Sequence, residues 1–140
     1  MTDQEIETLR MELPAYARSL GIEIERLEQG VPVLAMPFDS HVEGRPTVLH
    51  GGATSGLLEN AGYAALRTEL HRQGRQARLK PIGITVQFLT AARCQTTYAA
   101  GHVNRLGRRN ANIEVSAWQD DPARPVATAV MNILMVEDGA

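Results

Sequence analysis

The segment from Gly52 to about Arg72 constrains the fold more than any other part of the sequence. Polar residues dominate this segment only after Arg67, so we expect a central helix whose first four turns are buried. Aromatic residues make up only 4% of the chain, so aliphatic side chains and closely approaching backbones must fill the core. Tight packing of a helix on a sheet suits this composition. The mostly small apolar residues on one side of the helix are Ala53, Leu57, Ala61, Ala64 and Ala65.

Four later segments have the character of β-strands. Residues 82–88 and 111–117 alternate apolar and polar side chains, which is typical of strands with one buried face. The segments 98–106 and 127–136 are also strand-like, and the last is apolar on both sides. The links at 93–96, 107–110 and 120–125 are short and rich in turn residues, which suits antiparallel neighbours and leaves no room for crossover helices. We therefore expect a four-strand meander after the central helix.

The N-terminal part predicts a helix followed by a hairpin. Apolar spacing favours a helical extension over residues 1–20, which Pro14 kinks or splits and Gly21 stops. Two strand-like runs within 22–38 meet at Gln29-Gly30, and Pro32 and Pro37 suggest that the second is an edge or irregular strand. The expected whole is one α+β domain over 1–140.

Composition excludes several functional classes. The formal charge of −2 with 21% charged residues shows no basic patch for nucleic acids. The single cysteine, Cys94, excludes a disulfide framework and a zinc site with several thiolates, and no histidines have metal-ligand spacing. We therefore expect no metal and no cofactor. No stretch approaches the ~18 apolar residues of a membrane span and no signal peptide precedes the domain, so we expect a cytoplasmic protein.

Glu59 is the only formally charged residue between Arg45 and Arg67. It falls within the helix predicted to be buried, where an isolated carboxylate costs several kcal/mol unless partners relieve it. Its neighbours one turn away are mostly small and leave room for a ligand. The alternative is a carboxylate on a partly exposed helix face, bonded to Ser55 or Tyr63, and spacing alone leaves both open. The neighbours are Ser55, Gly56, Gly62 and Tyr63.

Gly51 and Gly52 stand at the expected start of this helix. The first N–H groups of a helix have no internal partner, and without side chains nearby they can hold a developing oxyanion. The alternative for the pair is a tight joint between loop and helix. Gly51 and Glu59 are separated by roughly 12 Å along a helix axis, at ~1.5 Å per residue. If both act on one carbonyl, they must come from two chains related by a two-fold axis.

Three motifs together resemble the hotdog-fold acyl-CoA thioesterases of the PaaI type, over roughly residues 22–137. They are His50-Gly51-Gly52 with an acid at Glu59, Ile84-Thr85-Val86-Gln87-Phe88-Leu89, and Gly107-Arg108-Arg109. The resemblance implies an antiparallel sheet wrapped around the central helix and an active site at a homodimer interface. It also implies dimers that commonly pair into tetramers, and an acyl-CoA substrate.

The resemblance also implies roles for individual residues. Glu59 is the catalytic carboxylate, either as nucleophile or as general base for a water, and sequence leaves the two open. The Gly51 N–H polarises the thioester carbonyl, with Gly52 beside it, and His50 helps to position that carbonyl. Relatives often carry Asn or Gln where this chain has Gly44, so Arg45 is a candidate replacement for the missing helper group.

The remaining candidates are substrate contacts. Thr85 is a loose substitute for a Ser or Thr that often flanks the acid from the third strand. Tyr63, one turn past Glu59, is expected to line the acyl pocket, and Phe88 is expected in the core or an interface. Four arginines are candidates for the CoA phosphates, since Arg forks match phosphate oxygens, although a charge cluster in a turn can also be merely solvated. These are Arg93, Arg105, Arg108 and Arg109.

The sequence thus favours an acyl-CoA thioesterase acting on an aryl or medium-length acyl group. Two alternatives stay open. One is an acyl-CoA-binding hotdog protein without efficient chemistry, suggested by the missing helper group at Gly44. The other is a hotdog hydratase or dehydratase using His50 and Glu59, although the usual hydratase motif is not visible.

Overall fold

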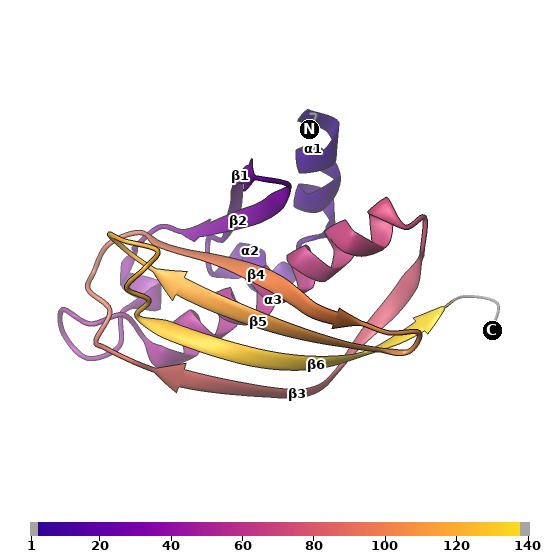
Figure 1. Ribbon diagram of the computed structural model, residues 1–140. Helices are drawn as coiled ribbons and strands as arrows, with labels where there is room; N and C mark the ends of the chain where they lie inside the picture. The colour runs from indigo at the N-terminus through magenta and orange to yellow at the C-terminus, as the bar shows by residue number, and fades with distance from the viewer. Residues whose placement is uncertain (1–2, 138–140) are drawn as a thin grey trace.

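The computed structural model describes residues 3–137, and it places the helices on one side of a single curved sheet (Figure 1). The outermost ends of the expected domain, 1–2 and 138–140, lie outside the described residues. In chain order the elements are α1 (Asp3–Glu12), α2 (Ala15–Ser19), β1 (Glu23–Glu28), β2 (Val31–Met36), the short 3₁₀ helix η1 (Ser40–Val42), α3 (Gly51–Arg72), β3 (Ala77–Phe88), β4 (Thr97–Leu106), β5 (Asn110–Trp118) and β6 (Ala127–Glu137).

The sheet is antiparallel throughout, and in the described chain its order is β1-β2-β4-β5-β6-β3. The expected four-strand meander is therefore wrong: β4, β5 and β6 form a meander, but β3 pairs with β6 and β4 with β2. The reason is the link from β3 to β4, which spans 89–96 and crosses the end of the sheet. Along this path the N–H of Leu89 donates to the carbonyl of Val126 at 2.8 Å, and the side chain of Gln119 bonds Arg93.

The hairpin of β1 and β2 turns at Gln29 and Gly30, as predicted, and both have positive φ angles (50° and 79°) that suit a tight hairpin turn. The expectation of an edge position for the second strand is wrong, because β2 lies between β1 and β4. Pro32 is tolerated there because β2 pairs with β4 only from Val33 onward. The missing N–H of Pro32 therefore breaks no bond to β4.

Helix α3 lies across the sheet and forms the centre of the core, with its start one residue earlier than predicted. Glycines allow the close approach that the composition suggested. A Cβ on Gly101 of β4 would lie 3.0 Å from the Cβ of Ala65 and 3.3 Å from the Cα of Gly62, so neither surface has room for larger residues. The result is an antiparallel sheet wrapped around a central helix, which confirms the α+β hotdog fold.

The N-terminal helices cover the other side of α3. Pro14 separates α1 from α2, and Gly21, with φ of 77°, ends the helical extension, both as predicted. Ala17 of α2 is fully buried against the core. No helix of residues 3–137 is long and apolar enough to cross a membrane.

Strand β3 forms one edge of the sheet, and much of its helix-facing side is uncovered. Ile84 is 37% exposed and Phe88 is 57% exposed, although both alternate with side chains of the opposite face. Ile82, at a β-bulge between Pro81 and Gly83, is 61% exposed. A long edge strand with exposed apolar residues is an unusual surface for an isolated chain.

Candidate active site

The start of α3 is capped by a histidine side chain. His50 is the N-cap residue, and its Nδ1 accepts a hydrogen bond from the N–H of Gly52 at 2.8 Å. A ring nitrogen that accepts a hydrogen bond carries no proton, so the neutral His50 ring has its proton on Nε2. This Nε2–H makes no hydrogen bond with the described part of the chain. His50 therefore combines a structural bond with a donor that faces outward.

Gly51, the first residue of α3, presents its backbone to solvent. Among residues 3–137 its N–H has no hydrogen-bond acceptor, whereas Gly52 donates to His50 and Thr54 donates to the carbonyl of His50 at 3.0 Å. A Cβ on Gly51 would meet only the ring of Phe88, at an ordinary 3.5 Å. Of the two predicted amides, the structure thus leaves Gly51 as the available donor, while Gly52 serves the cap.

A cleft of about 410 Å³ opens beside this helix start. It is formed by the loop before α3, the first turn of α3 and the end of β3, and it brings together Arg45, Gly51 and Phe88. This volume falls within the range typical of ligand sites. Three of the predicted site residues therefore meet at one place.

Glu59 is half-buried rather than buried, and this corrects the expected burial of the first four turns of α3. It belongs to a row of partly exposed residues spaced four apart: Ser55, Glu59, Tyr63 and Arg67. The predicted alternative of a partly exposed helix face is therefore confirmed, but its bond to Ser55 or Tyr63 is wrong, since no hydrogen bond or ion pair reaches the Glu59 carboxylate from the described residues. The carboxylate is available to a ligand.

Tyr63 and Arg67 continue this row. The guanidinium carbon of Arg67 lies 5.5 Å from the ring centre of Tyr63, within the range of a cation–π contact. Burial raises the pKa of the Tyr63 hydroxyl, and the negative charge of Glu59 raises it further, against a smaller opposing effect of Arg67. Burial lowers the pKa of Arg67, with Glu12 and Tyr63 opposing the change. The electrostatic effect of Glu59 on Tyr63 indicates that the two side chains share one face.

Thr85 is not brought to this site within the chain. It pairs in register with Val130, which is 42% exposed, whereas its neighbours Ile84 and Val86 pair with the buried Met131 and Ala129. Because side chains alternate along a strand, Thr85 lies on the sheet face opposite α3.

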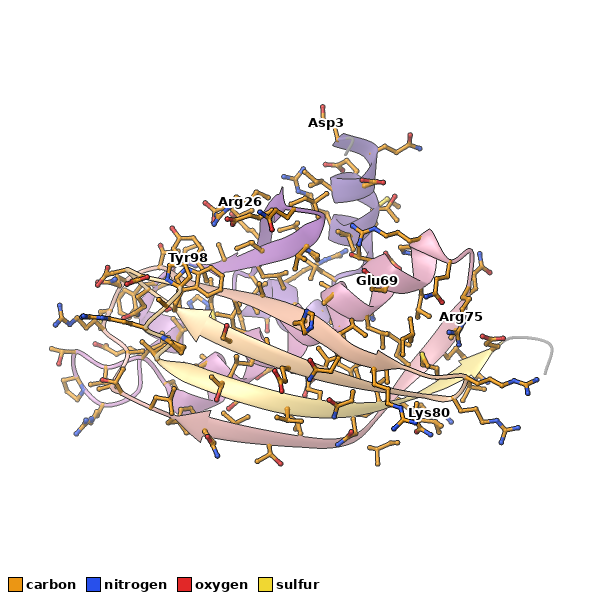
Figure 2. The ribbon with its side chains drawn as sticks, viewed as in Figure 1. Asp3, Arg26, Glu69, Arg75, Lys80 and Tyr98 are labelled. Atoms are coloured by element: carbon orange, nitrogen blue, oxygen red, sulfur yellow. The ribbon has the colours of Figure 1, made fainter. Side chains whose placement is uncertain are left out.

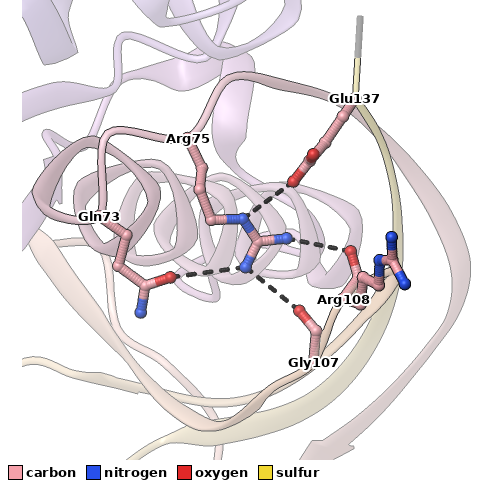
Figure 3. A network of polar contacts seen from close by, with 5 residues as sticks. All are labelled: Gln73, Arg75, Gly107, Arg108 and Glu137. Atoms are coloured by element: carbon pink, nitrogen blue, oxygen red, sulfur yellow. Dashed lines mark hydrogen bonds and ion pairs between the residues drawn. The ribbon is translucent and has the colours of Figure 1, made fainter. Parts of the chain in front are cut away.

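Arg108 lies at the other end of the sheet from Gly51. The turn of β4 and β5 is held by Arg75, which donates to the carbonyls of Gly107 (3.2 Å) and Arg108 (3.0 Å) and pairs with Glu137 at 3.0 Å (Figure 3). Figure 2 shows Arg75 far from Tyr98, which lies at the end where Phe88 meets Gly51. A surface hollow of about 580 Å³ at this turn is lined by Arg105, Arg108, Arg109, Asn112 and Asn132, among others.

The sequence prediction missed three residues. Arg67 continues the row of Glu59, and its spacing of four from Tyr63 is a signal that could have been found. Arg75 and Tyr16 left no local signal, because their partners are distant in the sequence: Arg75 meets the 107–108 turn, and Tyr16 lies over Gly56.

The family follows from a comparison of residues 47–126 with known families. This segment is more than half of the chain and contains the helix start, Glu59 and β3 to β5, and it matches the thioesterase superfamily. The chain belongs to the thioesterase superfamily. A comparison with curated proteins finds no match.

Three solved structures of proteins described as thioesterases share the fold of this chain. A thioesterase from Haemophilus influenzae is 20% identical, with a TM-score of 0.84, over 96% of this chain and 92% of that one. A mutant thioesterase from Pseudomonas aeruginosa is 21% identical, with a TM-score of 0.79, over 98% and 95%. A putative thioesterase from Ralstonia eutropha, described as related to phenylacetic acid degradation, is 21% identical, with a TM-score of 0.76, over 93% and 98%.

Proposed function

We propose that this protein is an acyl-CoA thioesterase that hydrolyses an acyl thioester to the free acid and CoA. One observation carries the proposal: α3 presents an unpaired N–H at Gly51 and an unbonded carboxylate at Glu59, with respect to the described residues. These are the two groups that thioester hydrolysis needs, a base or nucleophile and an oxyanion donor. Membership of the thioesterase superfamily supports the same chemistry.

The proposal requires a homodimer, because Gly51 and Glu59 of one helix lie roughly 12 Å apart along its axis. The uncovered β3 edge supports such a dimer. The exposed side chains of Ile82, Ile84 and Phe88 would be buried if two β3 strands met across a two-fold axis. Two α3 helices would then run antiparallel, and Glu59 of each protomer would lie near Gly51 of its partner. Pairing of dimers into tetramers stays a prediction.

The proposed reaction is a nucleophilic acyl substitution. The Gly51 N–H polarises the thioester carbonyl, and the Nε2–H of His50 is a second donor near the same oxygen. Attack by water, with Glu59 taking its proton, or by Glu59 itself forms a tetrahedral oxyanion that these donors stabilise. Collapse breaks the C–S bond, and the CoA sulfur leaves as a thiol, which takes the proton held by Glu59 on the water route and a proton from solvent on the direct route. On the direct route the mixed anhydride of the acyl group with Glu59 is then hydrolysed by water to the free acid and the Glu59 carboxylate. Single turnover in ¹⁸O-labelled water tests the direct route, since label enters the Glu59 carboxylate only when water opens such an anhydride at the Glu59 carbonyl.

The CoA phosphates are proposed to bind at the turn of β4 and β5. Arg105, Arg108 and Arg109 surround the hollow there, and Arg75 holds the turn in place. This turn is at the far end of the sheet from the same chain's Gly51, so in an antiparallel dimer it lies on the side of the partner's helix start. We therefore assign Glu59 and the arginine turn of one protomer, with Gly51 of the partner, to the same substrate.

Two matched variants test the oxyanion donor. Gly51→Pro removes the N–H at the first helical position, where proline is well tolerated. Gly51→Ala retains the N–H and adds a Cβ in ordinary contact with Phe88. We expect kcat to fall about 10²–10³-fold in Gly51→Pro and to stay within a few-fold in Gly51→Ala. Glu59→Gln should cost about 10²-fold or more. Full activity in Gly51→Pro or Glu59→Gln would reject the proposal.

A mixed dimer tests whether the site is shared. When one protomer carries Glu59→Gln and the other Gly51→Pro, the site combining the intact Glu59 with the intact Gly51 remains. We expect the purified heterodimer to recover about half of the wild-type activity, one site in two. If each site lay within one chain, both would be damaged, and an inactive heterodimer would show this.

A further inference from the structure

Tyr16 of α2 lies directly over α3 at a position where α3 has no side chain. A Cβ on Gly56 would lie 3.0 Å from the hydroxyl oxygen of Tyr16, 3.1 Å from its Cε2 and 2.7 Å from Cδ1 of Leu20. Any larger residue at Gly56 would therefore displace α2 or the Tyr16 ring. The fit of Tyr16 over α3 depends on this glycine.

Gly56 is one helical turn before Glu59, and side chains three apart on a helix are neighbours, with Cβ atoms about 5–6 Å apart. Gly56 also lies seven residues before Tyr63, which places Tyr63 two turns away on a similar face. Gly62, in contrast, faces Met131 and Val115 of the sheet. Tyr16 and Tyr63 thus flank Glu59 on the side of α3 that is away from the sheet.

Tyr16 has no evident role in the core. It is 53% exposed, whereas its neighbour Ala17 is fully buried and supplies the contact of α2 with the core. Its hydroxyl makes no hydrogen bond within residues 3–137, and only its backbone carbonyl accepts bonds, among them one from the Ser19 hydroxyl at 2.6 Å. Tyr16 therefore packs over Gly56 while its hydroxyl and much of its ring stay free to contact a ligand near Glu59.

We propose that Tyr16 is a specificity-determining residue, which closes the acyl end of the site on the helix side and limits the length of the acyl group. This inference rests on the proposed thioesterase function. The arginine turn lies in the sheet layer and Tyr16 in the helix layer, so a thioester whose phosphates bind the turn and whose carbonyl lies at Glu59 directs its acyl group toward α2. The ring of Tyr16 then stands in the path of a long chain.

The test compares hexanoyl-CoA with dodecanoyl-CoA in the full-length protein, using released thiol to obtain kcat/KM for each. In Tyr16→Ala we expect the dodecanoyl/hexanoyl ratio of kcat/KM to rise about 10-fold, which corresponds to about two further buried methylene groups. In Tyr16→Trp the ratio should fall. Gly56→Ala, which displaces Tyr16 without altering it, should raise the ratio as Tyr16→Ala does.

Tyr98→Ala is the matched control, because Tyr98 lies on the sheet face opposite α3 and stacks on Trp118, with ring centres 6.2 Å apart. The dodecanoyl/hexanoyl ratio of Tyr98→Ala should equal that of the wild type. An unchanged ratio in both Tyr16 variants, or an equal loss for both substrates, would overturn the role of Tyr16 and leave the thioesterase proposal intact. A wild type that hydrolyses no thioester would overturn the proposed function, and this inference with it.

Discussion

His50 and Gly52 form a cap in which a ring nitrogen, rather than a hydroxyl or carboxylate, accepts the N–H of the second helical residue, at 2.8 Å. The same bond sets the proton of the neutral ring on Nε2 and orients that nitrogen away from the helix. A Cβ on Gly52 would lie 2.9 Å from Cε1 of His50, so only glycine leaves room for the ring. The cap geometry therefore accounts for His50 and Gly52 of the His-Gly-Gly sequence.

The cap and the proposed catalytic role of His50 can be separated by two substitutions. Asparagine is a good N-cap residue, but its amide N–H is on a shorter side chain and does not reach as far as Nε2–H of His50, whereas alanine supplies neither the cap nor a donor. We expect His50→Asn to retain the free energy of unfolding while kcat falls about 10- to 100-fold, and His50→Ala to lose about 1 kcal/mol of stability as well. Denaturant unfolding and steady-state kinetics measure the two effects. Wild-type kcat in His50→Asn would limit His50 to capping.

Arg75 is expected to act through the turn that it holds. Its side chain is 21% exposed, and besides a 3.5 Å contact with Gln73 it bonds the Gly107 and Arg108 carbonyls and Glu137 (Figure 3). Arg75→Met should therefore raise KM for a CoA thioester about 3- to 10-fold, because two or three charge-assisted bonds no longer orient the turn. The thioester of N-acetylcysteamine, which has no phosphates, should react as with the wild type. Arg26→Met, an equal loss of charge on β1, is the control. Equal effects on both thioesters would place the role of Arg75 in overall stability instead.

The sequence was sufficient to predict elements whose signal is local. The small apolar face of α3, the Gln29-Gly30 turn and the break at Pro14 each depend on neighbouring residues, and each is confirmed. The order of the strands was not predictable in this way. A short loop between two paired strands and a loop that crosses the end of the sheet, as 89–96 does, have similar compositions. Only tertiary contacts, such as the bond of Leu89 to Val126, distinguish the two kinds of loop.

In the candidate site, too, local features were predictable from the sequence and features set by tertiary packing were not. Sequence reasoning selected Arg45, Gly51 and Phe88 as candidate site residues, and the three line one cleft. It overestimated the burial of Glu59, because the helical pattern does not reveal that α2 and the sheet leave a strip of α3 uncovered between them. The alternation of residues 82–88 already separates Thr85 from Ile84 and Val86, and the register with β6 places Thr85 on the face opposite α3.

The β3 edge should be essential for activity although it is far from the carboxylate in sequence. Ile84→Asp places a charge on the uncovered face of β3 and should convert the proposed dimer to monomers with little activity. Val130→Asp is the control, because Val130 is similarly exposed, at 42% against 37%, but lies on the opposite face of the sheet. Light scattering after size-exclusion chromatography gives the mass of each variant. A monomeric Ile84→Asp variant that retains full turnover would contradict the shared site.

The pKa of Tyr63 reports directly on whether Glu59 faces it. Burial is the largest cause of the raised pKa of this phenol, the Glu59 carboxylate adds to it, and Arg67 opposes it. An anion disfavours a second negative charge nearby, so Glu59→Gln should lower the pKa of Tyr63, but not fully to its usual value, since burial remains. Arg67→Met removes a cation and should raise it. Tyrosinate absorbance measured against alkaline pH gives these values, with Tyr63→Phe in each background subtracting the other two tyrosines. An unchanged pKa in Glu59→Gln would mean that the carboxylate points away from Tyr63, and Tyr63 could then not line the same pocket.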